Sequence, residues 1–360
     1  MRLHRIHGVL PPYLIDEIVS RDPSLIHLRE TTLVTQKLFL GRAQASNRFA
    51  RLAGAGKSEI DIYDAEEGYD RTKKLVRTEG GPVCGIEDAD NAYVYSEHIR
   101  KYLLEVLGRN GIDANGMRLI TTVRYGKGYN NAYWDGTQMT EGKGDGIIFA
   151  TFVLLDVHGH EVMHGVTEFH GNGKFVYRAQ PGALNEHLSD VGGETLEMWV
   201  KGIKPLDHDW VVGNGIFMPG INGTGIRNML KPGTAYDDKR LGKDPQPWKM
   251  SDYYKGSGDN YGVHYNSGIP NCVFARICCE LNDWIIPVKI WHATRAAVPN
   301  KPSFAQFAAT TLDAAKALGH GKFESVIRDA WKYCEVTPDI KALDKDVDAE
   351  GDDVEMFTAA

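Results

Sequence analysis

The sequence has few cysteines, no long apolar run and no overall excess of positive charge. Its five cysteines among 360 residues include no Cys-x-x-Cys pair, which is typical of reduced thiols in the cytosol. No stretch approaches the roughly 18 apolar residues that a membrane helix needs. The formal net charge of −7 argues against an overall nucleic-acid-binding surface. We therefore expect an ordinary globular protein with neither a membrane nor a nucleic acid as partner.

The charge that is present is concentrated at the two ends of the chain. Residues 1–57 carry nine Lys and Arg against four Asp and Glu, whereas residues 339–360 carry two Lys against eight Asp and Glu. We expect the acidic tail at 339–360 to be disordered. Arg and His residues interrupt residues 1–10, so we expect no ordinary signal peptide and synthesis in the cytoplasm. Export by a route without a signal peptide stays open.

Apolar periodicity predicts a first half that is rich in strands and a second half that is helical. The segments 59–63 and 119–125 are strand-like. Helical spacing recurs in the segments 91–107, 149–166, 182–200, 267–281, 303–318 and 322–334. We therefore expect an α+β fold with two lobes, a β-rich lobe at residues 51–150 and an α-helical lobe at residues 151–338.

The sharpest motif is His160-Glu161-Val162-Met163-His164, inside one of the expected helices. Two histidines four residues apart lie on one helical face, so both imidazoles can bind one Zn²⁺ at about 2.0–2.1 Å. Glu161 between them can address a metal-bound water without binding the metal. The competing interpretation is a helix with solvated charges, and the apolar flanking residues weaken it.

A catalytic zinc ion needs a third protein ligand and one open position. The chain offers His170, at the spacing of an HExxHxxGxxH pattern, and Glu186, in the next expected helix. Thr167 stands where that pattern requires glycine, so we favour Glu186. Asp190 lies four residues after Glu186 on the same face, where it could accept the outer N–H of a ligand histidine.

These motifs belong to a longer pattern, which comprises the segments 129–134, 144–146, 160–169, 182–190 and 259–268. In order and spacing, across about residues 60–336, they resemble the thermolysin-like zinc endopeptidases. The short head with Pro11-Pro12-Tyr13 resembles the protealysin branch of that family, in which a short propeptide precedes the enzyme. The resemblance implies a two-lobed thermolysin-like fold with the active-site cleft between the lobes.

The resemblance also implies a role for each matching residue. It makes His160, His164 and Glu186 the zinc ligands, Glu161 the general base and Asp190 the residue that orients a ligand histidine. The groups that match the family's oxyanion machinery are His264 and Tyr177, with Asp259 orienting His264. The residues that match substrate-backbone contacts or the cleft edge are Asn131, Ala132, Arg227 and Trp134.

Two further expectations come from the same resemblance. Phe149, Val157 and Ile226 match an apolar specificity pocket with Arg227 at its base, which implies cleavage before Leu, Phe, Ile or Val. Asp156, Glu197 and Asp209 match three ligands of the family's double calcium site. Val211 and Asn214 stand where two further acidic ligands would be. Because calcium prefers six to eight oxygen ligands, we expect weaker binding, one ion instead of two, or none.

Residues 1–50 are expected to be a propeptide that covers the cleft. The segment 44–58 is small, basic and rich in Gly and Ala, as in a linker or a cleavage site, so we place cleavage within about 43–58. The expected partners are peptide or protein substrates and this propeptide, and a protein inhibitor stays open. Two alternatives remain: a zinc aminopeptidase, for which no motif for a free N-terminus is found, and a catalytically silent, metal-stabilised binding protein.

Overall fold

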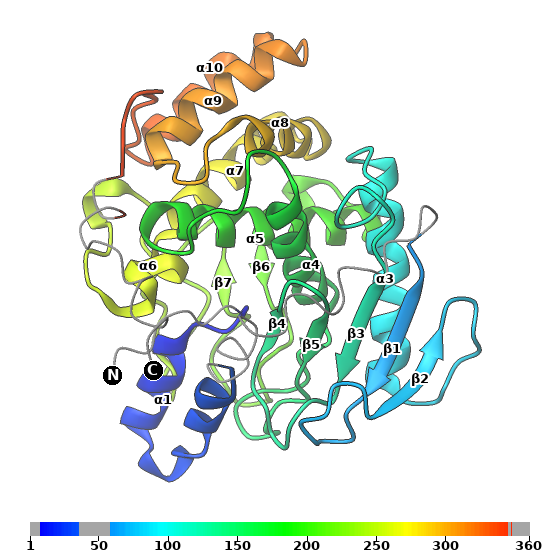
Figure 1. The fold of residues 1–360 in the computed structure, drawn as a ribbon. Coiled ribbons are helices and arrows are strands. Elements are labelled where there is room, and N and C mark those ends of the chain that lie inside the picture. Colours follow the sequence, from blue (N-terminus) through cyan, green and yellow to red (C-terminus); the bar gives the residue numbers. More distant parts are fainter. Residues whose placement is uncertain (1–7, 36–57, 345–346, 348–360) are drawn as a thin grey trace, which may run out of the picture.

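The computed structural model describes residues 8–35, 58–344 and 347. It contains a sheet-bearing N-terminal lobe and a helical C-terminal lobe, as the α+β expectation requires (Figure 1). The helix α1 (Pro12–Arg21) belongs to the head, residues 8–35, and contacts α6 (Gly258–Asn266) of the helical lobe. The residues 28–35 are helical as well. The expected cleavage segment lies almost wholly outside the described residues.

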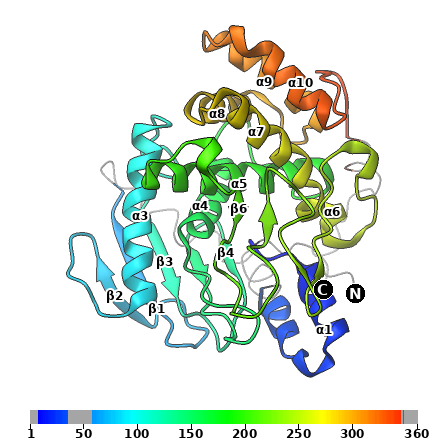
Figure 2. The same cartoon turned by 180° about the vertical axis from the view of Figure 1, so that it is seen from behind.

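The N-terminal lobe is built on a five-stranded sheet with the order β2-β1-β3-β5-β4. The central strands β1, β3 and β5 run parallel, and the two edge strands are antiparallel to their neighbours. Figure 2 shows the long helix α3 (Glu87–Glu105) across one face of this sheet. The strands are β1 (Ile60–Asp64), β2 (Lys74–Thr78), β3 (Leu119–Val123), β4 (Ala132–Trp134) and β5 (Met139–Glu141).

Two long buried helices, α4 (Leu155–Phe169) and α5 (Ala179–Lys201), connect the lobes and contact each other along their length. Glycine permits this close approach. A Cβ atom added at Gly193 would lie 2.4 Å from the carbonyl oxygen of Asp156, and one added at Gly159 would lie 3.0 Å from the Cα atom of Gly193. The absence of side chains at this crossing lets residues of α4 and α5 meet in one site.

The helical lobe adds further helices around α5. They are α6, α7 (Gly268–Leu281), α8 (Ile285–Ala297), α9 (Phe304–Ala317) and α10 (Glu324–Tyr333). Short strand pairs form the irregular part of this lobe, namely β6 (Val211–Val212) with β7 (Arg227–Asn228) and β8 (Asp237–Asp238) with β9 (Gly242–Lys243). Single turns of 3₁₀ helix occur at η1 (Pro23–Leu25), η2 (Pro205–Asp207), η3 (Met250–Asp252) and η4 (Gly321–Phe323).

Three sequence expectations about this lobe need correction. The helix expected at 149–166 begins only at Leu155, because Phe149 instead forms a β-bridge with Phe217. Helix α8 was not expected at all. Residues 339–344 of the expected tail are ordered, because Ser303 Oγ donates a 2.9 Å hydrogen bond to the carbonyl oxygen of Ala342 and Asp344 accepts one of 3.0 Å from the backbone N–H of Gln180.

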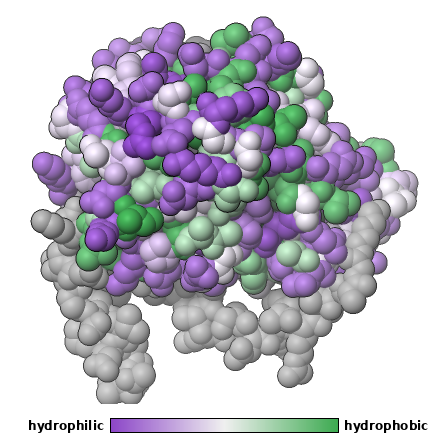
Figure 3. Space-filling view, turned by 90° about the horizontal axis from the view of Figure 1, so that it is seen from above, coloured by the Kyte–Doolittle hydropathy of each residue, from purple (hydrophilic) through white to green (hydrophobic). Residues whose placement is uncertain are grey.

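Most of the surface that Figure 3 shows is hydrophilic, with apolar residues scattered among polar ones. Within the described ranges, no helix has the length and apolar character needed to cross a bilayer. All five cysteines are free thiols, as their number and spacing indicated.

Candidate active site

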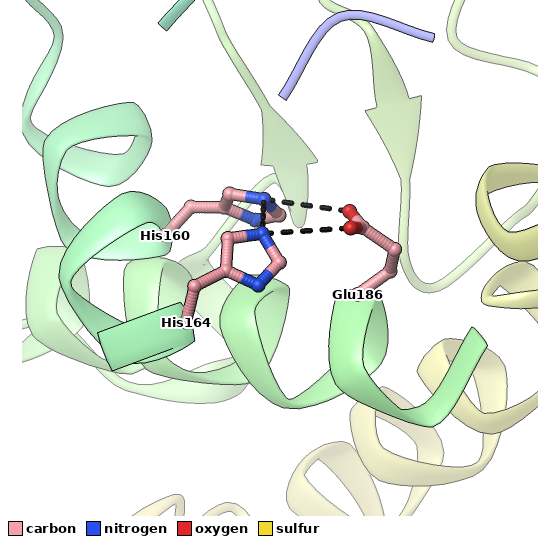
Figure 4. Close-up of side chains that lie close together, drawn as sticks. All are labelled: His160, His164 and Glu186. Atoms are coloured by element: carbon pink, nitrogen blue, oxygen red, sulfur yellow. Dashed lines mark hydrogen bonds and ion pairs between the residues drawn. The ribbon is translucent and has the colours of Figure 1, made fainter. Parts of the chain in front are cut away.

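His160 and His164 on α4 and Glu186 on α5 converge at the contact between the two helices (Figure 4). The two Nε2 atoms lie 3.1 Å apart. Nε2 of His160 is 3.5 Å from Glu186 Oε2, and Nε2 of His164 is 3.4 Å from Glu186 Oε1. These separations match those of ligands about 2.0–2.2 Å from one tetrahedral zinc ion. The three residues predicted as zinc ligands therefore form one candidate metal site.

Both imidazoles are oriented for binding through Nε2. The Nδ1 atom of His160 lies 2.8 Å from Asp190 Oδ1, and the Nδ1 atom of His164 lies 3.0 Å from Asn185 Oδ1. Donation from Nδ1–H leaves the Nε2 lone pair free for a metal. The sequence predicted this position for Asp190, whereas Asn185 was not considered, although it stands directly before the candidate ligand Glu186.

The charges around this site favour ionised carboxylates. Burial alone would raise the pKa of Glu186, but His264 and the two histidines of α4 hold the pKa well below its ordinary value. Burial likewise opposes ionisation of Asp190, and Arg227 overcomes it through hydrogen bonds of 2.7 and 3.0 Å and its charge, so the Asp190 pKa is lowered. Oε2 of Glu186 is buried and accepts no hydrogen bond. A buried oxygen without a donor is available to bind a metal ion such as zinc.

The alternative third ligand, His170, lies elsewhere. Its ring stacks on His292 with centroids 3.9 Å apart, and its Nδ1 atom lies 3.1 Å from Arg109 Nη1. Burial and the charge of Arg109 lower the His170 pKa to about 4. The structure therefore supports Glu186 over His170 as the third ligand.

Glu161 lies on the same helix between the two histidines, and its carboxylate is close enough to His160 and Glu186 for their charges to affect its pKa. Trp134 donates a 2.9 Å backbone hydrogen bond to Oε2 of Glu161. Burial raises the pKa of Glu161 to about 8, against the lowering effect of His160. A raised pKa makes the ionised form of a carboxylate a stronger base than that of an exposed one.

His264 and Tyr177 lie beside Glu186, as expected for groups that face a reacting oxygen. The Tyr177 hydroxyl bonds to Glu186 and lies 3.5 Å from His264 Nε2. Asp259 orients His264 through contacts of 2.6 Å to Nδ1 and 2.8 Å to the backbone N–H. Despite burial, Glu186 and Asp259 raise the His264 pKa. This favours a protonated Nε2 donor.

The turn before His264 has an unusual backbone. Asp259, Asn260 and Tyr261 have φ values of 54°, 51° and 65°, a left-handed conformation that costs roughly 1–2 kcal/mol per non-glycine residue. This turn brings the Asp259 carboxylate back to the His264 ring. Strain of this kind often marks a functional site.

Residues 8–10 of the head, which form bends, cross this site, and the ribbon of the head passes near the candidate ligands in Figure 4. Val9 N–H contacts Glu161 Oε1 at 3.0 Å and the carbonyl oxygen of Ala132 at 3.2 Å. Leu10 N–H donates a 3.0 Å hydrogen bond to Asn131 Oδ1. Two of the residues predicted to contact substrate, Asn131 and Ala132, therefore bind the peptide backbone of the head. Arg227 is the third residue that does so.

Arg227 Nη1 donates a 2.7 Å hydrogen bond to the carbonyl oxygen of Val9, and His264 Nε2 lies 3.1 Å from the carbonyl oxygen of Gly8. The Val9 side chain is fully buried in the core that also contains the expected pocket residues Phe149, Val157 and Ile226. Sequence reasoning expected the head to cover the cleft but did not identify the residues 8–10 that do so.

Two of the three expected calcium ligands, Glu197 and Asp209, cluster with Glu194 and His208, which no motif had indicated. Asp156 lies near enough to affect the pKa of Glu194, and its carboxylate accepts a hydrogen bond from the backbone N–H of Gly213. Calcium binding stays a prediction. Glu197 already faces Lys201 at 2.6 Å and His208 Nε2 at 3.0 Å. An imidazole and an ammonium group do not suit calcium, which prefers an all-oxygen shell.

Comparison with known proteins agrees with this geometry. The catalytic domain of thermolysin metallopeptidases matches residues 35–168, and their alpha-helical domain matches residues 173–336. The chain belongs to the thermolysin metallopeptidase family. An extracellular metalloprotease of Pectobacterium carotovorum subsp. carotovorum is 38% identical over 92% of this chain and 97% of its own. Members of this family are hydrolases, and the chain is a metalloendopeptidase.

Two further relatives extend the match. The protease PrtS of Photorhabdus sp. (strain Az29) is 38% identical over 94% of both chains. The solved precursor of protealysin, a metalloproteinase from Serratia proteamaculans, superposes with a TM-score of 0.81 at 37% identity, over 92% of this chain and 99% of its own. The similarity to a precursor agrees with a head that precedes the peptidase.

Proposed function

We propose that the chain is a zinc endopeptidase made as a zymogen, which hydrolyses peptide bonds on the N-terminal side of bulky apolar residues. One observation carries the proposal: residues 8–10 lie across the candidate metal site with their backbone groups bonded to Glu161, Asn131, Arg227 and His264. A cleft that binds the backbone of its own chain in this way is suited to a peptide substrate.

His160, His164 and Glu186 would hold the zinc ion, which would act as a Lewis acid and lower the pKa of a bound water. Glu161 accepts a proton from the attacking water and passes it to the leaving nitrogen, because its carboxylate lies 3.0 Å from the equivalent nitrogen, that of Val9. His264 and Tyr177 donate to the oxyanion, and one such donor is worth roughly 3 kcal/mol.

The head acts as an inhibitory propeptide in this proposal. The Gly8 carbonyl faces His264, and the Val9 nitrogen faces Glu161, so the bond between them lies where a substrate's scissile bond would lie. Gly8 has a φ of 151°, and a Cβ atom there would be 2.6 Å from the carbonyl oxygen of Ala132. Only glycine fits at this position, so a larger residue at position 8 would weaken the binding of the head to the cleft.

The apolar preference follows from the place of Val9. Its side chain is fully buried and belongs to the same hydrophobic core as Phe149, Val157 and Ile226, the residues expected to form the pocket after the scissile bond. A peptide that buries Leu or Phe there removes more apolar surface from water than one with a polar residue, and each buried side chain is worth about 1.5–3 kcal/mol.

The test uses an N-terminally blocked peptide with Leu or Phe after the scissile bond, and protein aged until its head is lost. We expect this protein to cleave the peptide, a zinc chelator to abolish the cleavage and added zinc to restore it. The variant Glu161→Gln should bind zinc but show no cleavage. Cleavage of only unblocked peptides would favour an aminopeptidase. No cleavage by zinc-loaded protein without its head would favour a silent binding protein, and either result would refute the proposal.

A further inference from the structure

We propose that His187, Asn271 and Trp291 are positioning residues for the zinc site, and that they act on His160 through a directional chain of buried hydrogen bonds. The inference rests on the proposed zinc function and adds these three residues to it. They lie on α5, α7 and α8, outside the ligands and the cleft.

The chain of contacts is continuous from Trp291 to the metal ligand. Trp291 Nε1 lies 2.6 Å from His187 Nε2, and His187 Nδ1 lies 2.8 Å from Asn271 Oδ1. Asn271 Nδ2 then donates a 2.8 Å hydrogen bond to Asp190 Oδ2, and the other oxygen of Asp190 lies 2.8 Å from His160 Nδ1. Every side chain in this chain is at most 1% exposed, so water cannot replace any of these partners.

The direction of every bond follows from the first one. An indole nitrogen can only donate, so Nε2 of His187 must accept and the proton of its neutral ring must be on Nδ1. Nδ1–H then donates to the Asn271 carbonyl, which turns the Asn271 amide group toward Asp190. A flipped Asn271 would face the carboxylate with its own oxygen, an unfavourable contact of two acceptors.

The hydrogen-bond acceptor positions of the Asp190 carboxylate are all used. Its two oxygens accept from Arg227 at 2.7 and 3.0 Å, from Asn271 and from His160. A carboxylate has about four acceptor positions, and four donors occupy them here. With Arg227 on one side and Asn271 on the other, the carboxylate cannot turn away from His160, and the His160 Nε2 lone pair stays directed at the metal site.

The test measures zinc affinity and melting temperature of the full chain, not hydrolysis. Wild type, Trp291→Phe, Asn271→Leu and the double variant are titrated with zinc against a chromophoric chelator. We expect Asn271→Leu to weaken zinc binding about 30-fold, within the range for outer partners of metal ligands. Trp291→Phe should weaken it about 3-fold in the wild-type chain and not at all beside Asn271→Leu, because the chain of bonds is then already broken.

Trp331→Phe is the matched control. Trp331 is buried and stacks on Trp291, with ring centroids 6.3 Å apart, but its Nε1 donates to Thr311 Oγ1 at 3.1 Å and leads to no metal ligand. We expect Trp331→Phe to lower the melting temperature and leave zinc affinity unchanged. An equal loss of zinc affinity in Trp331→Phe and Trp291→Phe, or full additivity of Trp291→Phe with Asn271→Leu, would overturn the inference.

If Asn271→Leu does not fold, Asn271→Asp serves in its place, because it keeps the size of the side chain and places a second acceptor against Asp190. It should weaken zinc binding and shift the visible absorption bands of the cobalt-loaded protein. An unchanged affinity and spectrum would refute the inference. Wild-type protein that binds no zinc, or Glu186→Gln that still binds it, would instead refute the proposed function, so the two failures are distinguishable.

Discussion

Helix α5 takes part in two clusters of acidic and histidine side chains that differ in their neighbours. In the zinc cluster, Glu186 and Asp190 face imidazoles and Arg227, and both pKa values are lowered. In the second cluster, made by Glu194, Glu197, His208 and Asp209, Glu194 faces mainly carboxylates. Burial, followed by Asp156 and Glu197, raises the Glu194 pKa well above its ordinary value, and neither of its oxygens has a hydrogen-bond donor.

Glu186 and Glu194 are equally buried, so burial alone does not distinguish a metal ligand. The charge of the surrounding groups does. Neighbouring imidazoles lower the pKa of a buried carboxylate and favour its ionised form, whereas neighbouring carboxylates raise the pKa and favour its protonated form. The comparison makes the two residues a matched pair for mutation, because both substitutions exchange a fully buried Glu for Gln on the same helix.

The largest effect is expected where a ligand is removed. Glu186→Gln should lose zinc and lower kcat/KM by at least about 10³-fold, because the metal's several kcal/mol of transition-state stabilisation disappear. Glu194→Gln should retain one zinc per chain and nearly the wild-type rate. Metal analysis and peptide hydrolysis, after removal of the head, check both. Loss of zinc in Glu194→Gln would contradict the distinction between the clusters.

The second effect concerns stability and pH. Because the folded-state pKa of Glu194 is raised, the unfolded chain releases this proton first as pH increases above about 4.5. Stability should therefore fall with rising pH up to the folded pKa. Glu194→Gln should remove that loss and be more stable than its parent by about 2 kcal/mol at pH 8, and by less at pH 5.

Urea unfolding at both pH values measures this difference, in a Glu161→Gln background that prevents self-cleavage. The matched control is Glu141→Gln, since Glu141 is equally buried but lies 2.7 Å from His158 Nδ1. That variant should be destabilised at pH 8. A Glu194→Gln variant that is also destabilised there would show that the Glu194 carboxylate is ionised and has a cation.

The sequence predicted the zinc cluster better than the second cluster for a physical reason. Helical spacing alone places His160 and His164 on one face of α4, and Glu186 and Asp190 on one face of α5. Local geometry was therefore enough to predict these two pairs. Glu194 sits on the same helix, but His208 reaches it from an irregular loop that has no periodic pattern. The contacts of residues 8–10 with Glu161 and Arg227 depend on tertiary folding, which single-chain periodicity does not encode.

The fold also divides into features that local sequence patterns predict and features that depend on tertiary packing. Apart from α4, which begins at Leu155 and not at residue 149, the long helices expected from the sequence were located to within about four residues, because their apolar periodicity is strong. Helix α8 was missed: it carries Pro287 near its start, a residue that is tolerated in a first turn but resembles a helix breaker in sequence. The order of residues 339–344 depends on packing against Ser303 and Gln306, which composition cannot predict.

A smaller effect should separate the two zinc histidines themselves. Asp190, a carboxylate, orients His160, whereas Asn185, a neutral amide, orients His164. Asn185→Ala should weaken zinc binding about 10-fold, at the low end for partners of metal ligands, because an amide polarises an imidazole less than a carboxylate does. Competition with a chelator measures it, and Asn115→Ala in an exposed turn is the control. An effect of Asn185→Ala above that of Asp190→Asn would contradict this ranking.

The smallest effect is expected from calcium at the second cluster. Asn214 Nδ2 donates a 2.6 Å hydrogen bond to Asp209, and Lys201 Nζ lies 2.6 Å from Glu197 Oε1. The backbone N–H of Gly213 donates a hydrogen bond to Asp156. Protein donors thus occupy oxygens of Asp156, Glu197 and Asp209, and among these neighbouring carboxylates Glu194 alone has both oxygens without a donor. At a calcium concentration equal to its Kd the gain is only about 0.4 kcal/mol. We therefore expect millimolar calcium to raise the melting temperature by less than about 2 °C. A rise of about 5 °C that Glu194→Gln abolishes would mean that calcium displaces these donors and that the two clusters are both metal sites.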